Sequence, residues 1–184
     1  AASTNVQDGN DDPFEWIDSG LFDDTGTRLV IVRKPGAEPR FLHLNSHRGA
    51  LAVGTDGQLT GHAAAREAFA VAAVDVFTAR GEAFTGGEAN PVEWFSSDGP
   101  RRIFYEEDGT PITPGEFLAS GGELRLKPDV AAADGVTTAT PGFAPFYGTS
   151  AAAPHAAALT ALLLEADPLL TPSGLRDLLD VTAL

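Results

Sequence analysis

Ser150 is the residue of this chain best placed to do chemistry. It ends the tripeptide Gly148-Thr149-Ser150, and the run that follows, Ala151–Leu164, carries no charged residue. Apart from one Pro, one His and one Thr, that run consists of Ala and Leu, which predicts a helix that is apolar on every side and therefore buried. A serine at the N-terminus of such a helix lies at the positive end of its dipole, with its own N–H free to stabilise an oxyanion. Ser150 is therefore a candidate nucleophile, and the alternative is a serine that only caps a core helix.

Two neighbours of the serine predict the local geometry. Gly148 permits the unusual dihedral angles and close backbone approach of a tight entry turn. We expect Pro154 in the first turn of the helix, where its missing N–H removes no hydrogen bond.

Further motifs stand in a fixed order around the serine motif Gly148-Thr-Ser-Ala-Ala-Ala-Pro-His155. They are Gly61-His-Ala-Ala-Ala65, Ala68-Phe-Ala-Val-Ala-Ala-Val-Asp75, Glu93-Trp-Phe-Ser-Ser-Asp-Gly-Pro100, Lys127-Pro-Asp-Val-Ala-Ala-Ala-Asp-Gly-Val136 and Leu170-Thr-Pro-Ser-Gly-Leu-Arg-Asp-Leu-Leu179. In this order and context they resemble the motifs of the subtilisin-like serine proteases, the subtilases. The resemblance covers residues 61–184 and implies an α/β fold, with part of a subtilisin-like parallel sheet around a central serine helix.

Composition and charge limit the classes of protein to which this chain can belong. A chain of 184 residues with 43% hydrophobic and 21% charged residues is an ordinary globular domain. The absence of Cys excludes a disulfide framework and a thiolate metal site, and the net charge of −14 argues against nucleic acid or an anionic membrane surface as partner. The apolar run of the serine helix is too short to span a membrane. Together with the resemblance, the acidic, Cys-free composition indicates an extracellular or periplasmic protein.

Residues 1–10 are polar and carry no helix or strand signal. Subtilases have a strand end, Ala-x-Gly-Asn, whose Asn side chain lines the oxyanion hole. The resemblance implies this role for Asn5 or, as the alternative, Asn10. Asn5 is the better match because small residues precede it.

Residues 11–60 are predicted to form an antiparallel β insert in the catalytic domain, because far more residues separate the oxyanion Asn from the motif Ala68–Asp75 than the resemblance implies. Thr27–Arg33 is predicted to be a strand between turn signals, Arg40–Asn45 is a second strand, and Gly49–Gly54 is a third candidate. Residues 61–184 then form the C-terminal part of the subtilase catalytic domain.

The rest of the chain carries clearer local signals. Ala70–Phe77 is an apolar run without alternation, as in a buried parallel strand, and Val130–Ala133 is similar to a strand. Residues 102–112 predict a hairpin that turns at Asp108-Gly109. Thr171-Pro172 predicts the N-cap and first turn of an amphipathic helix that ends near Leu179.

A complete triad needs a histidine and an aspartate besides the serine. Ile17-Asp18-Ser-Gly resembles the aspartate motif of the family, and Asn45-Ser-His47 resembles the approach to its histidine motif. The residues around Asp18 and His47, however, differ from those of the two family motifs. No buried apolar strand precedes Asp18, and Arg48-Gly49 follows His47 instead of the family's Gly-Thr-His. His155 is expected to be structural, and His62 to be a core or loop residue.

We therefore expect the C-terminal half of a subtilisin-like serine endopeptidase that acts on peptides or proteins through an acyl-enzyme on Ser150. The chain contains no Met, which is consistent with a natural fragment or a processed product, and the triad Asp and His are expected upstream. Alone, the chain is expected to be inactive. The alternatives are a non-catalytic binding or interaction module, and a self-sufficient hydrolase that uses Asp18 and His47.

No cofactor is required by this chemistry. The Asp-rich loops at residues 8–12 and 23–24 could bind structural calcium, although neither has the spacing of an EF-hand. Without the upstream half of the sheet, part of the serine helix is expected to lack cover, so self-association through Leu159, Leu162 and Leu163 is predicted.

Overall fold

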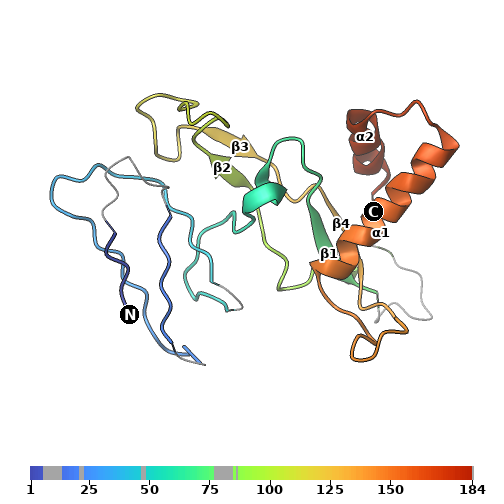
Figure 1. Ribbon diagram of the computed structural model, residues 1–184, viewed down its shortest axis with the longest axis horizontal. Coiled ribbons are helices and arrows are strands. Elements are labelled where there is room, and N and C mark those ends of the chain that lie inside the picture. Colours follow the sequence, from blue (N-terminus) through green and yellow to red (C-terminus); the bar gives the residue numbers. More distant parts are fainter. Residues whose placement is uncertain (6–13, 21–22, 47–48, 77–84, 86, 184) are drawn as a thin grey trace. The chain divides into compact units, whose positions relative to one another are not determined.

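The computed structural model describes residues 1–5, 14–20, 23–46, 49–76, 85 and 87–183, which form two compact units, Ala1–Glu38 and Pro39–Leu184 (Figure 1). The described residues of the first unit contain turns and extended segments but no helix or strand. Every helix and strand of the described residues lies in the second unit. In chain order they are η1 (Gly61–Ala64), β1 (Val71–Asp75), η2 (Gly87–Ala89), β2 (Arg101–Ile103), β3 (Glu123–Arg125), β4 (Val130–Asp134), α1 (Thr149–Ala166) and α2 (Pro172–Thr182).

The centre of the second unit is the parallel pair β1–β4, with α1 packed against both strands (Figure 1). The register runs from Val71 opposite Val130 to Asp75 opposite Asp134. Most buried apolar side chains of β1 and α1 are alanines, namely Ala72 and Ala73 in β1 and Ala151, Ala152 and Ala156 in α1, together with Val74 of β1. Small side chains let the helix backbone approach the strands closely. The two predicted strands and the predicted serine helix are thus confirmed, and the chain has the mixed helix and strand composition of an α/β protein.

The second pair of strands is antiparallel, with Arg102 of β2 opposite Leu124 of β3. The turn expected in the segment that follows β2 is present, since the Gly109 N–H donates to the Glu106 carbonyl at 3.0 Å. Its two arms meet only in the isolated bridge between Tyr105 and Pro111, so β2 pairs with β3 and not with residues 110–112.

The antiparallel β insert expected over residues 11–60 is not formed by the described residues of this segment, none of which lies in a strand. Residues 27–33 have the β-branched and apolar composition of a strand, but each is exposed and no described residue pairs with them in a strand. Such a run gives a stable strand only when a neighbouring edge and a core face are available. The assignment of the segments 1–10, 11–60 and 61–184 to separate domains stays a prediction.

Residues 39–60 belong to the second unit. The Phe41 N–H donates to the Phe117 carbonyl at 2.8 Å, and the Phe41 ring lies 5.9 Å from that of Phe104. Leu59 is buried in a small apolar cluster with Ala64 and Ala70. This part of the segment therefore contributes to the packing of the second unit.

The C-terminal helix α2 begins as the sequence predicts. The Thr171 hydroxyl accepts a hydrogen bond from the Gly174 N–H at 3.1 Å, and Pro172 occupies the first helical position. Leu175 is buried, and Arg176 forms an ion pair with Asp129 just before β4. Among the described residues, no helix combines the length and the apolar character needed to cross a membrane.

Candidate active site

Ser150 is the second residue of α1 and its side chain is exposed. The N-cap is Gly148, whose φ of 130° and ψ of 156° place it in a region that L-residues with a side chain rarely adopt, as expected for a tight entry turn. The Gly148 carbonyl accepts hydrogen bonds from Ala151 N–H at 2.8 Å and Ala152 N–H at 3.2 Å. Ser150 thus lies in the first helical turn, where backbone N–H groups have no acceptor within the helix.

The position of Pro154 differs from the prediction. Because the helix begins at Thr149, Pro154 is its sixth residue and lies in the second turn. Its missing N–H therefore leaves the Ser150 carbonyl without the hydrogen bond that a residue four positions later normally donates.

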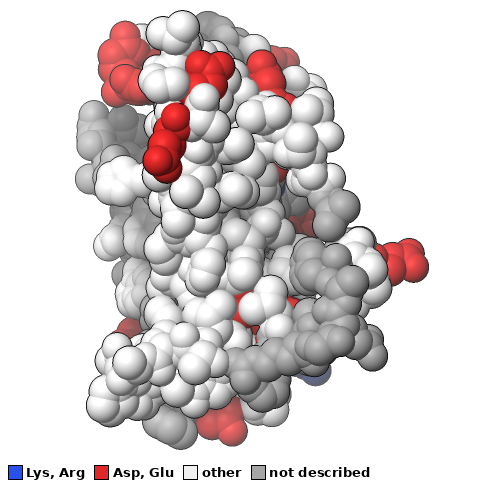
Figure 2. Space-filling view, turned by 90° about the vertical axis from the view of Figure 1, so that its right-hand side faces the viewer, with Lys and Arg blue, Asp and Glu red and all other residues white. Residues whose placement is uncertain are grey.

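The helix is buried only at its start. After Ala156, Leu159 is 48% exposed and Leu162 is 62% exposed, which agrees with the expectation that part of the serine helix lacks cover in this chain. The face of the molecule that carries α1 and α2 shows a broad area without charged side chains, with acidic residues mainly at its upper rim (Figure 2). Of the leucines named as contacts for self-association, Leu159 and Leu162 are exposed and Leu163 is half-buried.

None of the described histidines of the second unit hydrogen-bonds Ser150. His155, four residues after Ala151 on α1, bonds the Ala151 carbonyl through Nδ1 at 2.7 Å, as expected for a structural residue. His62 is exposed in η1. His43, which sequence reasoning did not single out, contacts the carbonyl oxygens of Asp56 at 3.1 Å and Arg102 at 3.3 Å. Burial, and next the nearby Arg101, lower the pKa of His43, which favours the neutral ring.

The other predicted site residues lie near the N-terminus. Asn5 is exposed in the first unit, while Asn10 and His47 lie outside the described residues. Asp18 is also exposed, and its Oδ1 accepts the Gly20 N–H at 2.8 Å in a local turn. This turn differs from the buried strand end on which the aspartate of a triad is expected.

Three carboxylates that sequence reasoning did not connect meet at the C-terminal ends of β1 and β4. Asp75 and Asp134 are register partners, and Glu93 is brought beside them because its N–H donates to the Ala73 carbonyl at 2.8 Å. One oxygen from each carboxylate lies within 4.8 Å of the other two. Burial, and then the neighbouring Asp134 and Asp75, raise the pKa of Glu93. Each strand ends in Asp, which is the signal that could have indicated this site.

Asp134 also contacts the approach to the serine. Its side chain is fully buried, Oδ2 accepts the Gly148 N–H at 2.8 Å, and the buried Oδ1 has no hydrogen-bond partner. The loop suggested for calcium at residues 8–12 lies outside the described residues. In the loop at 23–24, Asp23 accepts the Thr25 N–H and Asp24 the Ser19 hydroxyl, so both carboxylates take part in local turns.

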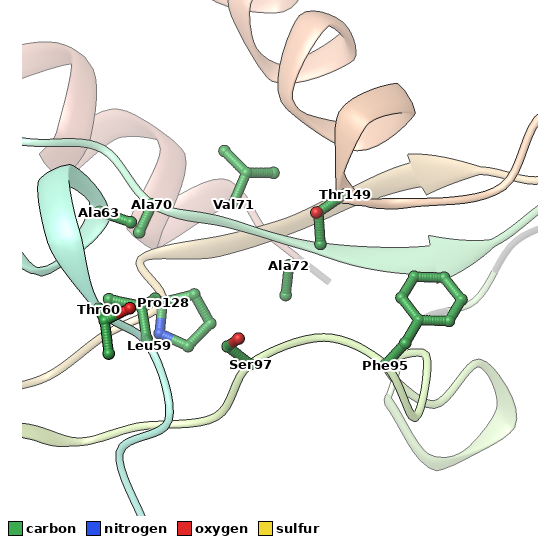
Figure 3. A pocket seen from close by; sticks show the side chains of 10 residues that line it. All are labelled: Leu59, Thr60, Ala63, Ala70, Val71, Ala72, Phe95, Ser97, Pro128 and Thr149. Carbon is green, nitrogen blue, oxygen red and sulfur yellow. The ribbon is translucent and has the colours of Figure 1, made fainter. Parts of the chain in front are cut away.

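A cavity of about 200 Å³ lies beside the residue that precedes Ser150 (Figure 3). Most residues that line it have apolar side chains, Ala72 of β1 and Phe95 among them, but polar and apolar atoms contribute similar shares of its surface. The polar side chains that line it are Thr60, Ser97 and Thr149. The cavity offers space for a small group close to the N-terminus of α1.

Comparison with known proteins agrees with the motifs. The family model described as the subtilase family matches residues 45–184, which include Ser150, the acidic cluster and the cavity. Comparisons with curated proteins and with solved structures gave no match. Because the family model matches well over half of the chain, the chain belongs to the subtilase family of serine peptidases.

Proposed function

We propose that this chain is the C-terminal part of a subtilisin-like serine endopeptidase, with Ser150 as the nucleophile. The supporting observation is an exposed serine in the first turn of α1, directly after a glycine turn. Its Oγ gives its proton to a general base and attacks a peptide carbonyl, and the tetrahedral intermediate then expels the amine of the cleaved peptide and leaves an acyl-enzyme. N–H groups of the helix N-terminus stabilise the oxyanion. A role in the oxyanion hole for Asn5, or alternatively Asn10, stays a prediction from the family resemblance. The substrate is a peptide or protein, no cofactor is required, and the parent is exported to the periplasm or the extracellular space.

The general base and its orienting aspartate are supplied, in this proposal, by polypeptide outside residues 1–184. The described histidines of the second unit make no hydrogen bond to Ser150, and His155 is already bonded to its own helix. Without a histidine to accept its proton, the serine hydroxyl is a weak nucleophile. The chain by itself should therefore be inactive.

Hydrolysis of a peptide anilide tests this directly. Loss of triad members lowers kcat by roughly 10⁴- to 10⁶-fold, so the purified chain should show no turnover above that of Ser150→Ala. The complete product of the reading frame should be labelled by a fluorophosphonate probe, and Ser150→Ala should abolish that labelling. A complete product that stays unlabelled would favour the non-catalytic module.

Turnover by the purified chain that disappears in Ser150→Ala would contradict inactivity. Asp18→Asn and His47→Ala would then be measured in the same assay. Loss of activity in both would assign the triad to residues of this chain, whereas retention in both would exclude them.

We also propose that the isolated chain self-associates through a second copy at α1. Burying an exposed leucine side chain contributes roughly 1.5–3 kcal/mol, and Leu159 and Leu162 are both about half exposed or more. Light scattering should detect dimers or larger species, and Leu159→Glu with Leu162→Glu should convert them to monomers. A wild-type chain that remains monomeric at high concentration would exclude this contact.

A further inference from the structure

The acidic cluster of Asp75, Glu93 and Asp134 has the geometry of a ligand set. Oxygen ligands of Ca²⁺ stand about 2.3–2.6 Å from the ion, so two ligands of one ion are at most about 5 Å apart. The three carboxylate oxygens lie within 4.8 Å of one another, which satisfies this limit for every pair. They come from two adjacent strand ends and the segment that runs beside β1.

Asp134 provides independent evidence for a missing partner. Its side chain has no exposed surface, and Oδ1 is buried without a hydrogen bond, although buried polar atoms are almost always paired. Among the described residues, neither Asp134 nor Glu93 forms an ion pair with Lys, Arg or His. A buried carboxylate beside two others is strongly unfavourable unless a positive charge compensates it.

We propose that Asp75, Glu93 and Asp134 bind one calcium ion at the C-terminal edge of the β1–β4 pair, beneath the entry to the serine helix. A set of three carboxylates suits a hard cation, and Ca²⁺ accepts irregular oxygen cages more readily than Mg²⁺, which demands near-ideal octahedral geometry. Water molecules complete the coordination. This site is separate from the Asp-rich loops at residues 8–12 and 23–24.

The ion would also act on the position of the nucleophile. Oδ2 of Asp134 already holds the Gly148 N–H, and Ser150 follows two residues later. Coordination through Oδ1 therefore fixes the carboxylate from its other side. The ion connects β1, β4 and the Glu93 segment to the turn that begins α1.

Calcium binding by the purified chain tests the proposal without any need for catalysis. After removal of divalent ions with EDTA, calorimetric titration with CaCl₂ should give one ion per chain, and the melting temperature should rise with CaCl₂. Loss of groups that merely support metal ligands costs about 10–100-fold in affinity, so Asp134→Asn and Glu93→Gln should each weaken binding at least ~10-fold. In EDTA, both variants should melt no lower than wild type, since each removes negative charge from the cluster.

Glu165→Gln and Asp180→Asn are matched controls, because each removes one exposed acidic charge elsewhere in the second unit. Both should bind Ca²⁺ as wild type does. If Asp134→Asn does not fold, the half-buried Glu93→Gln still provides the test. A wild-type chain that binds no Ca²⁺, that binds Mg²⁺ more tightly, or that keeps full affinity in Glu93→Gln would overturn the assignment.

Discussion

Replacing Asp129 should destabilise the second unit far more than the loss of an exposed carboxylate. Its side chain is 7% exposed and accepts hydrogen bonds from Lys127 Nζ at 2.9 and 2.8 Å and from the Ala70 N–H at 2.6 Å. It also forms an ion pair with Arg176 of α2. Asp129 thus joins three parts of the second unit: the entry to β1, the entry to β4 and the last helix.

The magnitude follows from what Asp129→Ala leaves behind. Lys127, whose side chain is 4% exposed, would keep only the Ala68 carbonyl as a partner, and the Ala70 N–H would lose its acceptor. Breaking a buried ion pair by removing one partner costs roughly 3–5 kcal/mol. That is a large share of the ~5–15 kcal/mol stability of a domain. Asp129→Asn, which retains an acceptor but not the charge, should cost less.

Urea denaturation followed by circular dichroism measures the free energy of unfolding of each variant. Asp180→Ala is the control, because removal of an exposed carboxylate should change stability by no more than about 0.5 kcal/mol. Adding Lys127→Met to Asp129→Ala should recover part of the loss, since no uncompensated buried charge then remains. A loss below about 1 kcal/mol for Asp129→Ala would refute the reasoning, because that is the range of an exposed ion pair.

Three further predictions concern local features of the fold. Thr171→Ala should lower the free energy of unfolding by about 1 kcal/mol in urea denaturation, because the Gly174 N–H loses its capping acceptor, whereas Thr171→Ser should be near neutral. Hydrogen bonds from Arg66 and then Arg125 lower the pKa of Glu123 below its usual 4.5. The stability that Glu123 provides is therefore present above pH 4.5 and is lost as the pH falls through the lowered pKa. In Glu123→Gln the melting temperature should therefore decline less steeply with acid than in the wild type. An unchanged decline would contradict this. Removal of residues 1–38 should leave cooperative unfolding intact, as the structure divides at that point, and a non-cooperative product would show that the second unit needs the first.

The strands and helices that the sequence predicted are those for which one local signal is sufficient. The run around Ala72 is apolar without alternation, a pattern that belongs to strands covered on both faces, and the centre of β1 is buried. Thr171 and Pro172 mark the start of α2 through a side-chain acceptor and a fixed φ, both of which act within one turn. The start of α1, where Ser150 lies, was predictable for the same reason, since Gly148 and the Ala-rich run are adjacent to it in the chain.

The features that were missed depend on residues far apart in the chain. The β-branched, apolar run of Thr27–Arg33 is a genuine strand signal, but it cannot reveal whether a partner edge exists. Pro154 was assigned to the wrong turn because the first helical residue is set by the conformation of Gly148, and helix boundaries are uncertain by a residue or two from sequence. The pairing of Asp75 with Asp134 follows from the register of β1 and β4, which no local pattern specifies.

Two independent constraints fix the conformation of the turn at Gly148, which precedes Ser150. The backbone of Gly148 adopts a φ of 130°, and a Cβ there would meet nothing closer than the Ser150 nitrogen at 3.7 Å, so the requirement for glycine is conformational and not steric. The second constraint is the Asp134 carboxylate, which holds the Gly148 N–H from the end of β4. A buried carboxylate beside those of Asp75 and Glu93 is unfavourable in this position unless a positive charge compensates it. The position of the turn before Ser150 and the net charge of the acidic cluster therefore depend on the same Asp134 carboxylate, and a bound cation would stabilise both.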